Sequence, residues 1–177
     1  MNSIARYAEM VFKRAQQAGS TILVFANGPS RTVPQGWPVA DARKQLVVLL
    51  KQLAVIAGKY KIILAFEPLN RYETNLINTI EEGITLIKEV NSPNVKLTAD
   101  FYHMMRENES PDVLLKAGKM LVHCHLAERA RRTPPGVYGD NFVPFFDVLK
   151  KLNYKGNISI ECSWSNLPLQ IGQAYTQ

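Results

Sequence analysis

The sequence has few cysteines, few histidines and no long apolar segment. Its 177 residues include two cysteines, Cys124 and Cys162, and three histidines. Each cysteine lies in an apolar, strand-like segment without a CxxC pattern, so we expect two buried, reduced thiols rather than a secreted disulfide scaffold. No apolar run reaches the roughly 18 residues that a membrane span needs, and the N-terminus lacks the apolar core of a signal peptide. We therefore expect a cytoplasmic protein without a membrane partner.

The basic residues are spread along most of the chain and do not form long runs. Lys and Arg number 21 against 15 Asp and Glu, which gives a formal net charge of +6. A basic balance can indicate a nucleic-acid partner, but the one tight group is Arg129, Arg131 and Arg132. We interpret Arg129 and Arg132 as solvated surface residues and expect no nucleic-acid partner.

Segments typical of helices alternate with short apolar segments typical of strands. Residues 3–18 have apolar side chains at helical spacing, Thr79 begins a capping box, and Ser110-Pro111 and Pro144 are typical helix starts. The expected strands are 21–26, 61–67, 95–100, 120–128 and 157–162. Strands separated by helices indicate βαβ units, so we predict an α/β fold with a parallel sheet.

Four side chains that can bind a metal ion lie at or near the ends of successive expected strands. They are Glu67, Asp100, His125 and Glu161, separated by 33, 25 and 36 residues, or about one βα unit each. Each alone has an ordinary interpretation as a loop carboxylate, a helix cap or a core histidine. Because the carboxyl ends of parallel strands meet at one edge, we expect all four to lie together. Three carboxylates and an imidazole favour a hard divalent cation such as Mn²⁺, Mg²⁺ or Co²⁺ over a structural zinc ion.

Several longer motifs carry a resemblance to a known family. They are FEPLNRYETNLINT (66–79), LTADFYHM (97–104), VHCHLAERARRTPPG (122–136) and ISIECSW (158–164). Together they resemble the xylose isomerase-like TIM barrel superfamily of sugar phosphate isomerases and epimerases, and most of all its D-tagatose/D-psicose 3-epimerase group. The fold that the resemblance implies is a partial (β/α)8 barrel of about five parallel strands, corresponding to the last five βα units.

The resemblance also implies a function in carbohydrate metabolism. Glu67, Asp100, His125 and Glu161 match the family's metal ligands, with Mn²⁺ as the expected cofactor and Mg²⁺ or Co²⁺ as alternatives. Glu67 and Glu161 also match its two acid–base carboxylates. The expected enzyme is an isomerase that epimerises C3 of a ketose through an enediolate, with one carboxylate removing the proton and the other returning it on the opposite face.

Three further residues match groups that hold the sugar in this family. Glu73 matches a carboxylate on the substrate side, and His103 and Arg131 match groups that contact the oxygens near C1 and C2. His123 lies two residues before His125, so it shares the same sheet face. We interpret His123 as an interior residue rather than a ligand.

The length leaves two alternatives open. A complete barrel needs about 250 residues, so we expect residues 1–177 to form a single truncated barrel domain without the first three βα units. The chain could then be a catalytically silent relative with a binding or structural role. A superfamily endonuclease is less favoured, because it needs extra histidines and none follows His125. An open sheet would leave two exposed edges, through which we expect a homo-oligomer to form.

Overall fold

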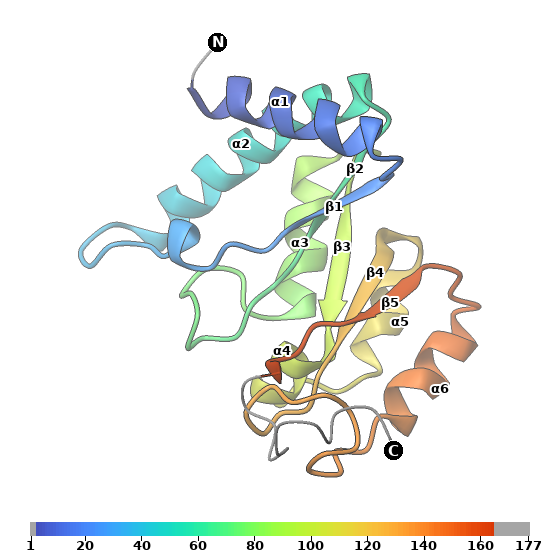
Figure 1. Cartoon of the computed structure of the whole chain (residues 1–177). Helices are drawn as coiled ribbons and strands as arrows, with labels where there is room; N and C mark the ends of the chain where they lie inside the picture. The colour runs from blue at the N-terminus through green and yellow to red at the C-terminus, as the bar shows by residue number, and fades with distance from the viewer. Residues whose placement is uncertain (1–2, 165–177) are drawn as a thin grey trace.

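The protein contains one five-stranded parallel sheet whose strands lie in chain order. The computed structural model describes residues 3–164. The strands are β1 (Ile22–Phe25), β2 (Ile63–Phe66), β3 (Val95–Asp100), β4 (Leu121–Leu126) and β5 (Asn157–Ile160). Each strand pairs in parallel with the next one along the chain, in the order β1-β2-β3-β4-β5 (Figure 1). This is a half-barrel, and it confirms the predicted partial TIM-barrel architecture.

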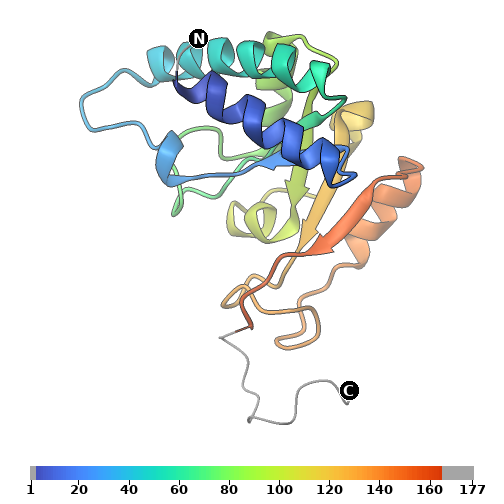
Figure 2. The same ribbon diagram turned by 45° about the horizontal axis from the view of Figure 1, so that its top comes forward.

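Helices connect the strands and cover the sheet. They are α1 (Ser3–Gln17), α2 (Val39–Lys59), α3 (Ile80–Val90), α4 (Phe101–Arg106), α5 (Val113–Ala117) and α6 (Val143–Lys151), with short 3-10 turns η1 (Pro29–Arg31) and η2 (Gly118–Met120). Helices α1 and α2 lie side by side over one part of the sheet (Figure 2). Leu50, Leu86 and Leu97 are fully buried in the core between helices and strands. Burial of this apolar surface is the main favourable contribution to the fold.

Local sequence signals account for most helix ends, with two differences. Thr79 caps α3, because its Oγ1 accepts a hydrogen bond of 3.2 Å from the backbone N–H of Glu82. The Glu82 carboxylate accepts from the N–H of Asn78 instead of that of Thr79, so the capping box is incomplete. The helix expected after Ser110-Pro111 begins only at Val113.

Helix α4 was not predicted from the sequence. It has six residues, too few to show an apolar period. Its start depends on Asp100, whose Oδ1 accepts a 2.8 Å hydrogen bond from the N–H of Tyr102. The helix turns His103 back towards the end of β3, where its Nε2 atom lies 3.5 Å from Asp100 Oδ2.

The two cysteines differ in exposure. Both are free thiols, and Cys124 in β4 is buried as expected. Burial raises the pKa of the Cys124 thiol to about 12, so it stays protonated. Cys162 lies beyond the end of β5 and is partly exposed, so the expectation of a buried thiol was wrong there. Among residues 3–164, no helix is both long enough and apolar enough to cross a membrane.

Candidate metal centre

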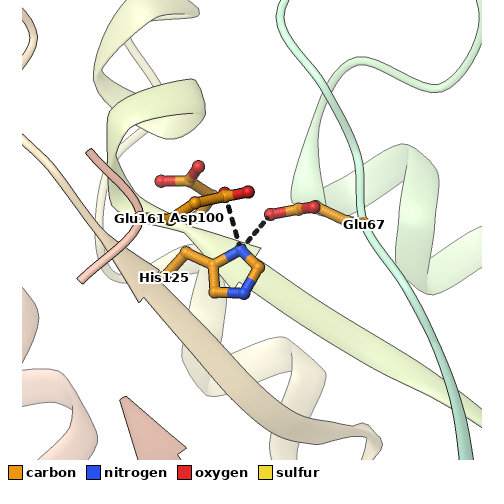
Figure 3. Close-up of side chains that lie close together, drawn as sticks. All are labelled: Glu67, Asp100, His125 and Glu161. Atoms are coloured by element: carbon orange, nitrogen blue, oxygen red, sulfur yellow. Dashed lines mark hydrogen bonds and ion pairs between the residues drawn. The ribbon is translucent and has the colours of Figure 1, made fainter. Parts of the chain in front are cut away.

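The four predicted metal ligands lie together at the carboxyl end of the sheet. Asp100 ends β3 and His125 lies in β4, while Glu67 and Glu161 directly follow β2 and β5. One ligand atom from each lies within 4.8 Å of all the others. Figure 3 shows the carboxylates of Glu67 and Glu161 converging on one nitrogen of the His125 ring, with Asp100 next to Glu161. The arrangement follows from parallel pairing in chain order, which aligns Asp100 with His125 across β3 and β4.

The His125 ring connects two of the carboxylates. Its Nδ1 atom lies 2.7 Å from Glu67 Oε1 and 3.0 Å from Glu161 Oε2. Burial lowers the pKa of His125, but the hydrogen bonds to Glu161 and Glu67 outweigh burial and raise it to about 10. A protonated imidazole therefore balances part of the carboxylate charge.

The carboxyl groups of the cluster have pKa values shifted in different directions. Burial, reinforced by the charge of Glu67, raises the pKa of Asp100 to about 7. Burial also raises the pKa of Glu67. Burial acts in the same direction on Glu161, but its contacts with His125 and Arg132 outweigh burial and lower its pKa. Two carboxyl groups with opposite shifts are suited to acid and base roles in one reaction.

The cluster also contains a buried oxygen that lacks a partner. Within the described part of the chain, Glu67 Oε2 is buried and accepts no hydrogen bond. Such an atom costs free energy unless a cation or a donor satisfies it. Three carboxylates and one imidazole nitrogen are a suitable donor set for a hard divalent cation. The residues present therefore fit a divalent metal ion.

Arg132 is a member of the cluster that the sequence analysis placed on the surface. Its Nη2 atom lies 2.7 Å from Glu161 Oε2 and 3.2 Å from Asp100 Oδ2, and its Nη1 atom lies 3.6 Å from Glu73 Oε1. The guanidinium also stacks over the Tyr102 ring, 4.9 Å from its centroid. Arg132 therefore supplies a second positive charge to the carboxylates.

Arg131, the residue predicted to contact substrate, lies beside Arg132 and is exposed. Both arginines have a positive φ, 55° and 54°, so the chain turns sharply there. Nothing in the sequence shows which of two adjacent arginines such a turn directs at the cluster. The substrate role of Arg131 stays a prediction.

The other two predicted substrate residues lie next to the cluster. His103 is buried in α4, with Nε2 3.5 Å from Asp100 Oδ2 and Nδ1 3.9 Å from Glu73 Oε1. Burial, followed by the nearby Arg132 charge, lowers the pKa of His103 to about 3. His103 is therefore a neutral imidazole at physiological pH. The structure brings Glu73 and His103 together at the edge of the candidate metal site.

Arg31 in η1 contacts the backbone of Glu67, one of the four candidate ligands. No sequence pattern predicted this contact. The Arg31 side chain is buried, and its Nη1 atom donates a 3.0 Å hydrogen bond to the backbone carbonyl of Glu67. The guanidinium lies 4.6 Å from the centroid of the Phe66 ring. Burial lowers the pKa of Arg31 to about 10 although the charges of Glu67 and Glu73 oppose this shift. Arg31 thus ties the loop after β1 to the backbone of a candidate ligand.

The chain belongs to the xylose isomerase-like TIM barrel family. The family model matches residues 2–176, almost the whole chain. The predicted resemblance is thereby confirmed, and so is the fold that it implied.

Relatives in this family are sugar epimerases. The chain is 36% identical over 143 residues to an L-ribulose 3-epimerase of Methylomonas sp. (strain DH-1), covering 72% of this chain and 50% of the relative. It is 35% identical over 123 residues to a D-psicose 3-epimerase of Enterocloster bolteae, covering 67% of this chain and 40% of the relative. The chain thus spans about half the length of these relatives or less.

A solved structure shows the same arrangement of elements. It is a D-allulose 3-epimerase from Methylomonas sp. in complex with D-allulose, with a TM-score of 0.78 and 31% sequence identity. The similarity covers 92% of this chain and 57% of that one.

Another buried carboxylate, Glu128, organises the loop that carries Arg132. The carboxylate accepts hydrogen bonds from the hydroxyl of Thr133 and from the backbone N–H groups of Gly136, Tyr138 and Gly139, at 2.6 to 2.9 Å. Burial acts to raise the pKa of Glu128, but these four donors outweigh burial and lower it. The loop between β4 and α6 is therefore folded around one ionised side chain.

We expect Glu128→Gln to lower the free energy of unfolding by about 1–3 kcal/mol, because an amide cannot accept from four donors. The folded pKa of Glu128 lies below its unfolded value of about 4.3, so the ionised group stabilises the fold above that pH. The difference between wild type and variant should shrink as the pH falls through the folded pKa. Urea unfolding from neutral pH to about pH 3 measures this. A difference that is the same across the series would contradict the assignment.

Proposed function

We propose that this chain carries the metal and acid–base centre of a sugar epimerase that acts at C3 of a ketose. The observation that carries the proposal is the cluster of Glu67, Asp100, His125 and Glu161, whose ligand atoms lie within 4.8 Å of one another. The relatives named L-ribulose 3-epimerase and D-psicose 3-epimerase support the same activity. The substrate class in this proposal is a small ketose sugar.

The proposed cofactor is a divalent cation held by these four side chains, with Mn²⁺ favoured and Mg²⁺ or Co²⁺ as alternatives. The buried, unpartnered Oε2 atom of Glu67 supports this role. A bound cation of this kind would act as a Lewis acid on the carbonyl and the adjacent hydroxyl of the sugar. The proton now shared by His125 with Glu67 and Glu161 would leave when the imidazole becomes a ligand.

The acid–base roles follow from the two glutamates. Glu161 has a lowered pKa and would remove the C3 proton as a carboxylate, leaving an enediolate. Glu67 has a raised pKa and would return a proton to C3 on the opposite face of the sugar, which inverts the centre. His103 and Arg131 would donate hydrogen bonds to the sugar oxygens on which negative charge develops.

A binding role without catalysis is the alternative function. It is favoured by one observation, namely that the chain spans about half the length of its relatives. Separate measurements of metal binding and of sugar epimerisation therefore distinguish the two functions.

We expect Asp100→Ala to abolish Mn²⁺ binding measured by titration calorimetry. Loss of even an outer partner of a metal ligand typically weakens binding by about 10–100-fold, and loss of a buried ligand should cost more. Arg132→Gln should instead tighten binding by about 5-fold or more, because it removes a cation that contacts Asp100 and Glu161. Asp147→Ala, on the exposed face of α6, is the matched control. Equal affinity in all variants would refute the metal site.

We expect the Mn²⁺-loaded protein to interconvert free ketoses that differ at C3. Chromatography of the sugars measures this interconversion. Glu67→Gln and Glu161→Gln should each reduce the rate by at least about 100-fold, because each loses one proton-transfer group. Glu89→Gln, at an exposed position of α3, should leave the rate unchanged. Inactivity combined with retained Mn²⁺ binding would favour the binding role instead.

We also propose that the open sheet associates with a second copy of the chain. Among the described residues, β1 and β5 each pair on one side only, and Ile158 and Ile160 of β5 are exposed. Unpaired strands with exposed apolar side chains favour association. Sedimentation velocity should show a dimer for the wild type and a monomer for Ile158→Lys. A monomeric wild type would show that the edges do not pair.

A further inference from the structure

Asn70 is a buried residue of the loop after β2 whose contacts converge on His103. Its backbone N–H donates to His103 Nδ1 at 3.1 Å. Its side-chain Nδ2 atom lies 2.7 Å from the same Nδ1 atom. Both residues are almost completely buried, Asn70 at 0% and His103 at 2% exposure, so water does not compete for these contacts.

The orientation of the Asn70 amide is fixed by a third contact. Its Oδ1 atom accepts a 3.0 Å hydrogen bond from the backbone N–H of Tyr72. The NH₂ group must then face the other way, towards His103 Nδ1 and, at 3.4 Å, Glu73 Oε1. A flipped amide would place two donors against each other at Tyr72, which excludes it.

Two donors on His103 Nδ1 determine where the ring carries its proton. A backbone N–H can only donate, so Nδ1 must be the acceptor. A neutral imidazole has one N–H, and it must therefore be on Nε2. The opposite tautomer would set the Nδ1–H against two donors and the Nε2 lone pair against Asp100 Oδ2, 3.5 Å away.

The Nε2–H group is a donor without a partner. Within residues 3–164, Nε2 of His103 is buried and makes no hydrogen bond, since the 3.5 Å separation from Asp100 Oδ2 is too long for a good one. A buried N–H of this kind costs free energy unless a ligand accepts from it. It lies at the edge of the metal cluster, where a sugar oxygen would bind.

We propose that Asn70 is a positioning residue that fixes His103 as its Nε2–H tautomer, so that His103 only donates and does so to an oxygen of the bound sugar. The part that concerns the sugar rests on the proposed function. The assignment also explains why His125, and not His103, belongs to the metal cluster. With its proton on Nε2 and its other nitrogen occupied by Asn70, His103 has no lone pair free for a metal ion or for a proton of the substrate.

The tautomer can be measured without any activity by ¹⁵N NMR of the histidine side chains. The chain has three histidines, so His103→Gln identifies the His103 signals by their loss. In the wild type, we expect Nδ1 to resonate as an unprotonated nitrogen and Nε2 as a protonated one. Protonated Nδ1 in the wild type would overturn the proposal, whether or not the protein epimerises a sugar.

Two variants separate a tautomer effect from a loss of packing. Asn70→Asp keeps the size of the side chain but sets a carboxylate oxygen against Nδ1 where the NH₂ donor stood, 2.7 Å away. A charged acceptor at that distance outweighs the one backbone donor that remains, so we expect a proton to appear on Nδ1 and kcat to fall by about 100-fold. Asn70→Ala removes more contacts but keeps the backbone donor, so Nε2 should remain protonated and kcat should fall less. A merely structural role predicts the reverse order. The His123 and His125 signals show in each case that the variant is folded.

If no variant or wild type epimerises a ketose while the NMR result is as expected, the proposed function fails and the tautomer assignment stands. If the tautomer is unchanged in Asn70→Asp and the wild type epimerises a ketose, the positioning role of Asn70 fails and the proposed function stands.

Discussion

Burial of several carboxylates at one end of the sheet is the constraint on which the site depends. Glu67 and Asp100 are almost completely buried, and carboxylates in such a place must be protonated, paired with cations or bound to a metal ion. The chain supplies two cations, His125 and Arg132, which contact four carboxylates between them. A divalent cation would supply the same charge at one point. A bound cation would therefore alter both the contacts of Arg132 and the protonation of His125.

The fold and the four candidate ligands could be predicted because both depend on local patterns. Buried parallel strands are continuous apolar runs, and their carboxyl ends meet at one edge whatever the details of the helices. A polar group directly after such a run is therefore placed by the strand itself. This reasoning applies to Glu67 and Glu161, which follow their strands directly, and to Asp100, which ends one.

The residues that the sequence did not reveal are positioned by loops. Arg132 enters the cluster through a turn with two consecutive positive φ values, in a loop folded around the buried Glu128. Helix α4 begins because Asp100 caps it, so this residue has both its ordinary role as a helix cap and a place in the cluster. Asn70 is also positioned by its loop, because the orientation of its amide depends on Tyr72 and Glu73 in the same loop. Such contacts involve specific side chains and have no period in the sequence.

The metal cluster and the recognition of a sugar depend on different parts of the structure. The four candidate ligands come from β2 to β5, four adjacent strands that the chain contains in full. Pairing between these strands brings the four candidate ligands to one edge of the sheet. A sugar pocket also needs walls around the metal ion, and the match covers only 50% and 40% of the two epimerase relatives. Metal affinity therefore depends on the pairing of β2 to β5 and on the contacts of Arg132, whereas turnover also depends on everything that would surround a bound sugar.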